Sequence, residues 1–205
     1  MKHASMTGCV CQARGSIHLI IGPMFSGKTT ELFRLTKRYI LAGKKTILVK
    51  YAKDKRHNTD MATTHDRVHR EAFSTLRIKD VYNSIINYDI IGIDEGQFFP
   101  DIVPYAQKLA NQGKTLLIAA LNGDYLQKPF RPIATLLAQA ERIEKLNAVC
   151  QLCGHSASFT YRIIARPERE LIGGIESYQA VCRLCYRDLY KKKSVIEQEN
   201  ARSAI

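Results

Sequence analysis

The feature that most constrains the fold of this chain is the octapeptide Gly22-Pro23-Met24-Phe25-Ser26-Gly27-Lys28-Thr29. It has the form G-x-x-x-x-G-K-[ST] of a phosphate-binding loop. The apolar run 17–21 before it predicts a buried parallel strand, and apolar residues at helical spacing after it predict a helix from Lys28 to about Leu41. In such a unit, backbone N–H groups and the positive end of the helix dipole surround a polyphosphate. We therefore expect these residues to bind a nucleoside triphosphate, with Lys28 reaching the β- and γ-phosphates and Thr29 ligating Mg²⁺.

The rest of the chain continues this alternation of strands and helices. Apolar runs predict strands at 45–49, 88–93 and 115–121, and helical spacing predicts helices at 79–87, 101–112 and 132–141. Residues 51–70 are polar and are expected to form a long loop. Strands that alternate with helices predict an α/β fold with a mostly parallel sheet and right-handed crossovers.

A second site feature is the acidic end of the predicted strand at 88–93. Asp94-Glu95-Gly96-Gln97 follows four apolar residues, which is the form of a Walker B strand. We expect Asp94 to hold Mg²⁺, Glu95 to act as general base on the phosphate acceptor, and Gln97 to belong to the nucleotide site. An Asp–Glu pair at a strand end is common, but a complete phosphate-binding loop in the same sheet makes the catalytic interpretation the stronger one.

Four cysteines have the spacing of a metal site. Cys150-x₂-Cys153 and Cys182-x₂-Cys185 are separated by 28 residues. Two such pairs predict a tetrahedral Cys₄ zinc site, and four thiolates leave no open position, so the zinc should be structural. The alternative is four buried thiols without metal. Cys9-x-Cys11 is a weaker signal.

Length and charge limit the classes of function. With 205 residues there is room for one α/β domain and a small appendage, and no apolar run is long enough for a membrane span. The net charge of +12 invites a nucleic-acid interpretation. However, residues 34–57 carry nine Lys or Arg against one Asp, and this segment leads away from the phosphate-binding loop, so its charge could equally hold a triphosphate. Residues 1–16 lack a secretory core, although a transit peptide stays open, and we expect a cytoplasmic protein with reduced thiols.

From about Gly15 to Tyr186 the chain resembles the type II thymidine kinases of animals, many bacteria and poxviruses. The resemblance rests on residues 22–28 and on Lys50-Tyr51-Ala52-Lys53-Asp54, Thr64-His65-Asp66-Arg67, Ile91-Gly92-Ile93-Asp94-Glu95-Gly96-Gln97-Phe98-Phe99, Lys128-Pro129-Phe130, Gly173-Gly174 and Val181-Cys182-Arg183-Leu184-Cys185-Tyr186.

The resemblance implies a RecA-like kinase domain at 15–147 and a zinc-bearing domain at 148–190. The tails at 1–14 and 191–205 carry no usable resemblance, and we expect them to be disordered. It implies that Glu95 deprotonates the 5′-hydroxyl of thymidine or deoxyuridine, to which ATP gives its γ-phosphoryl group. Asp54 and Arg56 match residues near the phosphates, and residues 167–178 match a lasso loop that closes over the base. The matched nucleoside-binding positions are Met24, Phe98, Leu121, Tyr125, Phe130, Thr160, Arg169, Glu170, Leu171, Ile172, Gly173 and Tyr178.

The family also implies partners, and this sequence departs from it at two positions. Relatives are homotetramers or homodimers and are inhibited by the end product dTTP. Tyr125 stands where many relatives have Phe, and Asn122 stands where Asp is usual, so analogue tolerance is open. The alternative function is a nucleic-acid-stimulated RecA-like ATPase, but 205 residues cannot hold the second RecA-like domain that such helicases use. We therefore expect Mg²⁺, ATP, thymidine and structural Zn²⁺ as partners, with neither nucleic acid nor a membrane.

Overall fold

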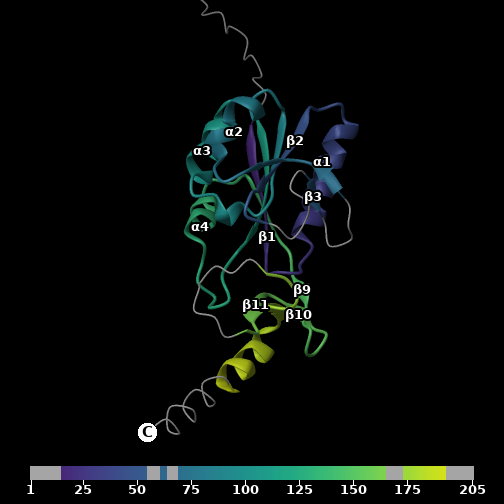
Figure 1. Cartoon of the computed structure of the whole chain (residues 1–205), viewed down its shortest axis with the longest axis vertical. Helices are drawn as coiled ribbons and strands as arrows, with labels where there is room; N and C mark the ends of the chain where they lie inside the picture. Colours follow the sequence, from purple (N-terminus) through teal and green to yellow (C-terminus); the bar gives the residue numbers. More distant parts are fainter. Residues whose placement is uncertain (1–14, 55–60, 64–68, 165–172, 193–205) are drawn as a thin grey trace, which may run out of the picture.

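The computed structural model describes residues 15–54, 61–63, 69–164 and 173–192 (Figure 1). Its centre is a six-stranded sheet in the order β5-β2-β6-β7-β1-β8, in which each pair of neighbours is parallel. The strands are β1 (Ser16–Gly22), β2 (Thr46–Tyr51), β5 (Phe73–Thr75), β6 (Ile90–Ile93), β7 (Thr115–Leu121) and β8 (Arg142–Lys145). The predicted parallel α/β sheet is confirmed.

Helices cover both faces of this sheet, because alternate residues of each buried strand point to opposite sides. On one face α1 (Lys28–Leu41) packs Leu32, Phe33 and Leu35 against strand residues such as Ile20. On the other face lie α2 (Ile78–Ile85), α3 (Ile102–Asn111) and α4 (Arg131–Leu137), packed on the second and larger core (Figure 1). The carboxyl ends of β1 and β6 consequently meet at one edge, where open α/β sheets bind their ligands.

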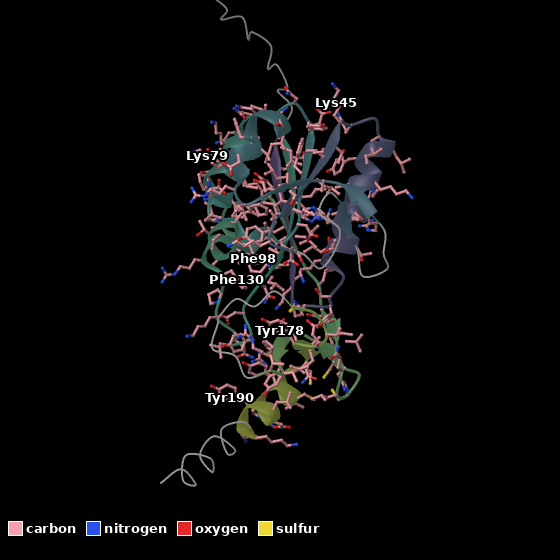
Figure 2. The ribbon with its side chains drawn as sticks, viewed as in Figure 1. Lys45, Lys79, Phe98, Phe130, Tyr178 and Tyr190 are labelled. Carbon is pink, nitrogen blue, oxygen red and sulfur yellow. The ribbon has the colours of Figure 1, made fainter. Side chains whose placement is uncertain are left out.

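A smaller part of the molecule lies beyond that edge and contains the cysteine pairs. Two antiparallel hairpins form it, β9 (Ala148–Val149) with β10 (Ser156–Ala157) and β11 (Phe159–Arg162) with β12 (Tyr178–Val181). Residues 183–192 follow as a helix. Phe25 of the phosphate-binding loop packs against the core of this part. In Figure 2, Tyr178 and Tyr190 mark this part, and Phe98 and Phe130 lie on the side toward the sheet.

Three expectations about secondary structure need correction. The predicted loop at 51–70 contains the strand β3 (Met61–Thr63) and the first two residues of β4 (His69–Glu71). These two strands pair in an antiparallel arrangement. The helix predicted over 132–141 ends at Leu137, and residues 142–145 form the edge strand β8, which the sequence did not reveal. Three of the four residues of β8 are exposed, so no run or alternation of apolar side chains marks it. The short strand β5 was missed as well.

The described helices include none that is long and apolar enough to cross a membrane. The domain boundaries at residues 147 and 148 stay a prediction, as do the disordered tails, which lie almost wholly outside the described residues.

Candidate active site at the phosphate-binding loop

The phosphate-binding loop has the backbone that its sequence demands. At Gly22 a Cβ atom would lie 2.5 Å from the carbonyl oxygen of Leu146, so no side chain fits there. Gly27, with φ of 79°, takes the left-handed conformation directly before α1. The carbonyl oxygen of Pro23 accepts hydrogen bonds from Lys28 Nζ at 2.6 Å and from Ser26 Oγ at 2.9 Å. The Lys28 ammonium group therefore lies over the loop, where a phosphate oxygen would replace the carbonyl as its acceptor.

The acidic end of β6 lies beside the phosphate-binding loop. Thr29, in the first turn of α1, donates a hydrogen bond from Oγ1 to Asp94 Oδ1 at 3.2 Å. The same carboxylate oxygen accepts the backbone N–H of Glu95 at 3.0 Å, and the Asp94 N–H donates to the carbonyl oxygen of Val49. A hydroxyl and a carboxylate, 65 residues apart in sequence, thus lie together beside the phosphate-binding loop. These are oxygen ligands of the kind that Mg²⁺ prefers. Their role as metal ligands stays a prediction.

Glu95 occupies a strained backbone position and its side chain is held in place. Its φ of 54° and ψ of 42° lie in the left-handed region, which costs a non-glycine residue about 1–3 kcal/mol. Its Oε2 accepts a hydrogen bond from Gln97 Nε2 at 2.6 Å. Gln97 is buried in η1 (Gly96–Phe98), and its Oε1 accepts the backbone N–H of Leu121 at 3.0 Å.

Gln97 thus links the end of β7 to Glu95, a role that the sequence did not indicate. Both ends of its amide are bonded within the protein. Its predicted role in nucleotide binding stays a prediction, whereas its contact with Glu95 orients the candidate base.

Part of the predicted nucleoside site lines a cavity of about 460 Å³ at the same edge. Phe98 and Phe130 both line it, with ring centroids 6.3 Å apart, and Tyr51 packs on Phe98 at 5.3 Å. Arg77 and Arg131 also line it, and neither was singled out from the sequence, because isolated arginines in loops and at helix starts carry no pattern. The cavity combines aromatic walls with cationic side chains.

Two other predicted nucleoside-binding residues, Tyr125 and Tyr178, contact Arg162, which the sequence analysis did not single out. Arg162 is buried and donates a hydrogen bond from Nη2 to the Tyr178 hydroxyl at 2.8 Å. Its guanidinium carbon lies 3.8 Å from the centroid of the Tyr125 ring, a cation–π contact. Two residues earlier on β11, Thr160 Oγ1 accepts the backbone N–H of Met24 at 3.0 Å. Arg162 takes an inward-facing position on a strand, and a charged residue at such a position is the sequence signal that could have indicated its importance.

The loop expected to close over the base is only partly described. Arg169, Glu170, Leu171 and Ile172 lie outside the described residues, as does Arg56. Gly173 is buried, and a Cβ atom on it would lie 2.7 Å from Ser177 Oγ. Asp54 follows β2, and its backbone N–H donates to the carbonyl oxygen of Tyr51.

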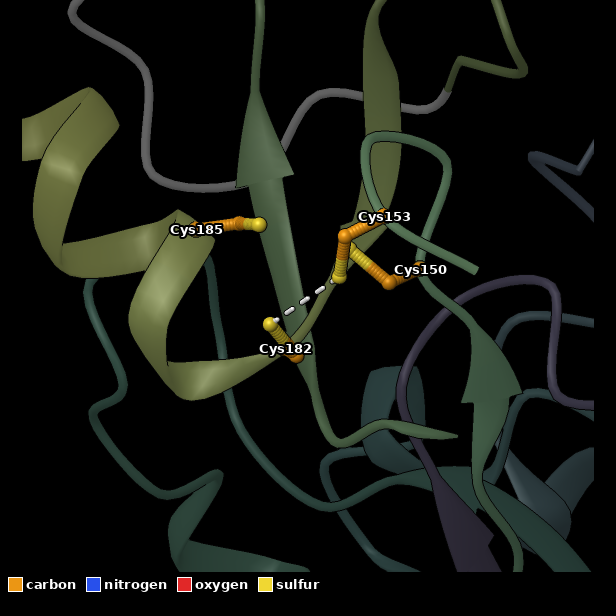
Figure 3. Close-up of side chains that lie close together, drawn as sticks. All are labelled: Cys150, Cys153, Cys182 and Cys185. Carbon is orange, nitrogen blue, oxygen red and sulfur yellow. Dashed lines mark hydrogen bonds between the residues drawn. The ribbon is translucent and has the colours of Figure 1, made fainter. Parts of the chain in front are cut away.

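The four cysteines converge on one point (Figure 3). All are free thiols, and their sulfur atoms lie within 4.8 Å of one another. Cys153 Sγ and Cys182 Sγ are 3.6 Å apart. Cys150 and Cys153 flank the turn after β9, and Cys182 and Cys185 come from the end of β12 and the start of the C-terminal helix. The predicted grouping of the two pairs is confirmed.

The ionisation of these thiols is what a cation site requires. Burial raises the pKa of the Cys150 thiol, but backbone N–H groups of Cys182, Leu152 and Cys153 outweigh it and lower the pKa to about 6. The Cys182 side chain, followed by the Cys153 side chain, raises the pKa of Cys185 to about 12. Crowded thiols cannot all ionise together without a positive charge between them. A tetrahedral Zn²⁺ would supply that charge, so the donor set fits zinc.

Comparison with known proteins agrees with this geometry. The family model described as thymidine kinase matches residues 15–186. The chain is 51% identical to thymidine kinase 1 of Dictyostelium discoideum over 181 residues, which cover 86% of this chain and 80% of that protein. It is 49% identical to the cytosolic thymidine kinase of Gallus gallus over 187 residues, or 91% of this chain and 83% of the relative. It is 52% identical to the thymidine kinase of Sheeppox virus over 172 residues, which cover 84% of this chain and 97% of that protein.

Proposed function

This chain belongs to the thymidine kinase family, and we propose that it transfers the γ-phosphoryl group of ATP to the 5′-hydroxyl of thymidine or deoxyuridine. The observation that carries the proposal is the hydrogen-bonded series Thr29–Asp94–Glu95–Gln97 beside the phosphate-binding loop. Together with Lys28 over the loop, this series supports an arrangement of one phosphate-binding cation, two oxygen ligands for a metal and one oriented carboxylate at a single sheet edge. A phosphoryl transfer needs these groups and little else.

In this mechanism each group has a separate task. The loop N–H groups and Lys28 hold the β- and γ-phosphates, which draws the Lys28 ammonium away from the Pro23 carbonyl oxygen. Thr29 and Asp94 hold Mg²⁺, which when bound offsets the negative charge of the phosphates. Glu95 accepts the proton of the attacking 5′-hydroxyl, and the Gln97 amide fixes the direction of the Glu95 carboxylate. Asp54 and Arg56 lie near the phosphates by resemblance to the family.

Selection of the nucleoside follows from the aromatic cavity and from the loop that closes over the base. Phe98 and Phe130 provide apolar walls. The Leu121 N–H bonds Gln97, which also lines this cavity, and Thr160, on the same strand as Arg162, accepts the Met24 N–H. From the resemblance to the family, we infer that Tyr125 and Tyr178 contact the nucleoside. By resemblance to the family, we expect backbone groups at Leu171 to Gly173 to pair with the base edge of thymine, and the amino group of cytosine would leave them unpaired. Buried mismatches of this kind lower kcat/KM by powers of ten.

A kinase assay tests this proposal. Purified protein is incubated with Mg²⁺, ATP and radiolabelled thymidine, deoxyuridine, deoxycytidine or deoxyadenosine, and nucleoside monophosphate is measured. We expect turnover of the first two and almost none of the others. Deoxycytidine turnover comparable to that of thymidine would refute the specificity. ATP hydrolysis that requires single-stranded DNA and ignores thymidine would favour the nucleic-acid-stimulated ATPase instead.

The same family membership supports proposals about metal, assembly and location. The Cys₄ cluster holds a structural Zn²⁺ that fixes both ends of residues 154–181, the segment that contains the loop over the base. The chain assembles as a homodimer or homotetramer, and dTTP inhibits it as end product. It works in the cytoplasm, since the Gallus gallus relative is named a cytosolic thymidine kinase. Size-exclusion chromatography with light scattering and dTTP inhibition kinetics test the first two of these.

A further inference from the structure

A cavity of about 640 Å³ lies apart from the phosphate-binding loop, between the segment that follows β7 and the helix at 183–192. Leu126, Gln127 and Lys128 form one wall. The helix forms the other wall with Arg183, Tyr186, Arg187, Tyr190 and Lys191. Small-molecule sites have volumes of roughly 300–1,000 Å³, so this cavity has the size of such a site. It shares no lining residue with the cavity beside Phe98.

The helix wall is a regular stripe of two kinds of side chain. Its members recur at positions i, i+3, i+4, i+7 and i+8, which is one face of a helix. Tyr186 and Tyr190 stack with an interplanar angle of 12° and centroids 6.3 Å apart. Tyr190 is 53% exposed, so its ring is accessible for stacking by a ligand. Arg183, Arg187 and Lys191 on the same wall are cationic, and the Arg183 guanidinium carbon lies 4.8 Å from the centroid of the Phe159 ring.

The charge of the cavity has one sign. Lys128 faces the three cations of the helix, and the described residues that line the cavity include no acidic side chain. Asp188 lies on the same helix and pairs with Arg187 at 3.3 Å, but both side chains are 59% exposed, and such pairs contribute little. Four cations around a space of this size match the several negative charges of a polyphosphate.

The loop wall is held rigidly. Asp124 Oδ1 accepts the backbone N–H groups of Leu126 at 3.0 Å and Lys128 at 2.8 Å, and Asp124 is buried. Gln127 has a φ of 62°, a left-handed conformation that costs about 1–3 kcal/mol and that clusters at functional sites. A preformed wall lowers the entropic cost of binding a ligand.

The cavity is also connected to the nucleoside-binding residues. The Tyr186 hydroxyl donates a hydrogen bond to the carbonyl oxygen of Tyr125 at 2.8 Å. The Tyr125 ring packs against Arg162, which in turn bonds Tyr178. A ligand stacked on the tyrosine pair would therefore contact a residue that positions Tyr125.

We propose that this cavity binds a second nucleoside triphosphate, with the base stacked on Tyr190 and the phosphates held by Lys128, Arg187 and Lys191, and that its occupancy changes the affinity for the nucleoside substrate. A cavity of about 640 Å³ has the size of a small-molecule site, which favours a free nucleotide over a nucleic-acid strand, because a strand needs an extended groove. The coupling passes through Tyr186 and Tyr125.

Equilibrium dialysis with radiolabelled ATP and Mg²⁺, without nucleoside, tests the site by counting bound ATP per chain. The wild type should bind a second equivalent beyond the one at the phosphate-binding loop. Arg187→Gln with Lys191→Gln should weaken only this second equivalent, by roughly tenfold for each lost charge-assisted contact. Lys192→Gln is the matched control, since Lys192 is a neighbouring exposed cation of the same helix that does not line the cavity. Lys28→Ala should weaken only the first equivalent.

The outcomes separate the proposal from its rivals. A single equivalent in the wild type, or equal loss in Lys192→Gln, would overturn it. Displacement of the second equivalent by oligothymidylate at far lower concentration than by ATP would overturn it in favour of nucleic acid. Tyr190→Ala should weaken ATP but not inorganic tripolyphosphate, and equal weakening of both would overturn the stacking. If the double variant loses its helical circular dichroism, Lys128→Gln on the opposite wall replaces it. Because binding is measured without nucleoside, failure here leaves the kinase proposal untouched.

The coupling between the second site and the nucleoside-binding residues is tested by a separate measurement, the KM for thymidine. Saturating the second site should shift the KM for thymidine in the wild type and in Lys192→Gln, and the shift should vanish in the double variant while its kcat stays unchanged. An identical shift in the double variant would overturn the coupling.

Discussion

Exchanging the side chains of Glu95 and Gln97 would separate what their hydrogen bond does for stability from what the carboxylate does for catalysis. The bond from Gln97 Nε2 to Glu95 Oε2 is 2.6 Å long, and Gln97 is only 5% exposed. Hydrogen bonds to charged groups contribute about 1.5–3 kcal/mol. In Gln97→Glu the donor becomes a second carboxylate, and its other oxygen can still accept the Leu121 N–H. We therefore expect the free energy of unfolding to fall by at least that amount, which lowers Tm by roughly 3–12 °C.

The double variant Glu95→Gln, Gln97→Glu restores an amide–carboxylate pair with the positions reversed. Its Tm should return to within about 2 °C of the wild type, because the same type of hydrogen bond forms again. Its kcat should nevertheless stay as low as that of Glu95→Gln, roughly 10²–10⁴-fold below the wild type, since the carboxylate has left the position of the base. Gln97→Glu alone keeps the base but loses its orientation, and kcat should fall by roughly tenfold or more.

Scanning fluorimetry and steady-state phosphorylation of thymidine measure these effects. Gln112→Glu is the control, because Gln112 is an exposed residue after α3 whose Oε1 accepts from the Tyr82 hydroxyl. It should change neither quantity. A kcat near that of the wild type in Glu95→Gln, with ATP and thymidine still bound, would refute the assignment of the base. A double variant that stays as unstable as Gln97→Glu would show that the hydrogen bond does not orient Glu95.

Three further predictions concern stability and metal. Burial, followed by Arg142, lowers the pKa of His18, so the unfolded chain binds more protons below about pH 6.5 and the free energy of unfolding should decrease as the pH falls. Urea unfolding at several pH values should show this slope reduced in His18→Gln and kept in the exposed control His155→Gln. Gln127→Gly should raise Tm by a few degrees at most, since relief of the left-handed strain, about 1 kcal/mol or more, exceeds the entropic cost of glycine; a lower Tm would contradict this. Cys182→Ser should lose most of the bound zinc by elemental analysis and should lower Tm, whereas Cys9→Ser should retain the zinc; full zinc in Cys182→Ser would refute the Cys₄ site.

The parts of this protein that could be predicted from its sequence are those whose chemistry depends on local spacing. The loop at 22–29 needs particular residues at fixed positions along one stretch of chain, because its ligand contacts come from consecutive backbone groups. The cysteine pairs are equally local, since each C-x₂-C unit brings two sulfur atoms to one ion. The buried strands around Ile17 and Ile90 can be recognised in the sequence, because both of their faces are covered and their residues therefore form continuous apolar runs.

Contacts between distant segments could not be predicted from the sequence and are known from the tertiary structure alone. Hydrophobic periodicity reports that a residue is buried but does not identify its partner, so nothing in the sequence connects Gln97 with Leu121 and Glu95, or Tyr186 with Tyr125. Arg162 lies inside a short strand, where its guanidinium group contacts two tyrosines from other segments, by a cation–π contact with Tyr125 and a hydrogen bond to Tyr178. The exposed edge strand β8 is fixed by its hydrogen bonds to β1 and by few side chains of its own, so its formation depends on the sheet that precedes it.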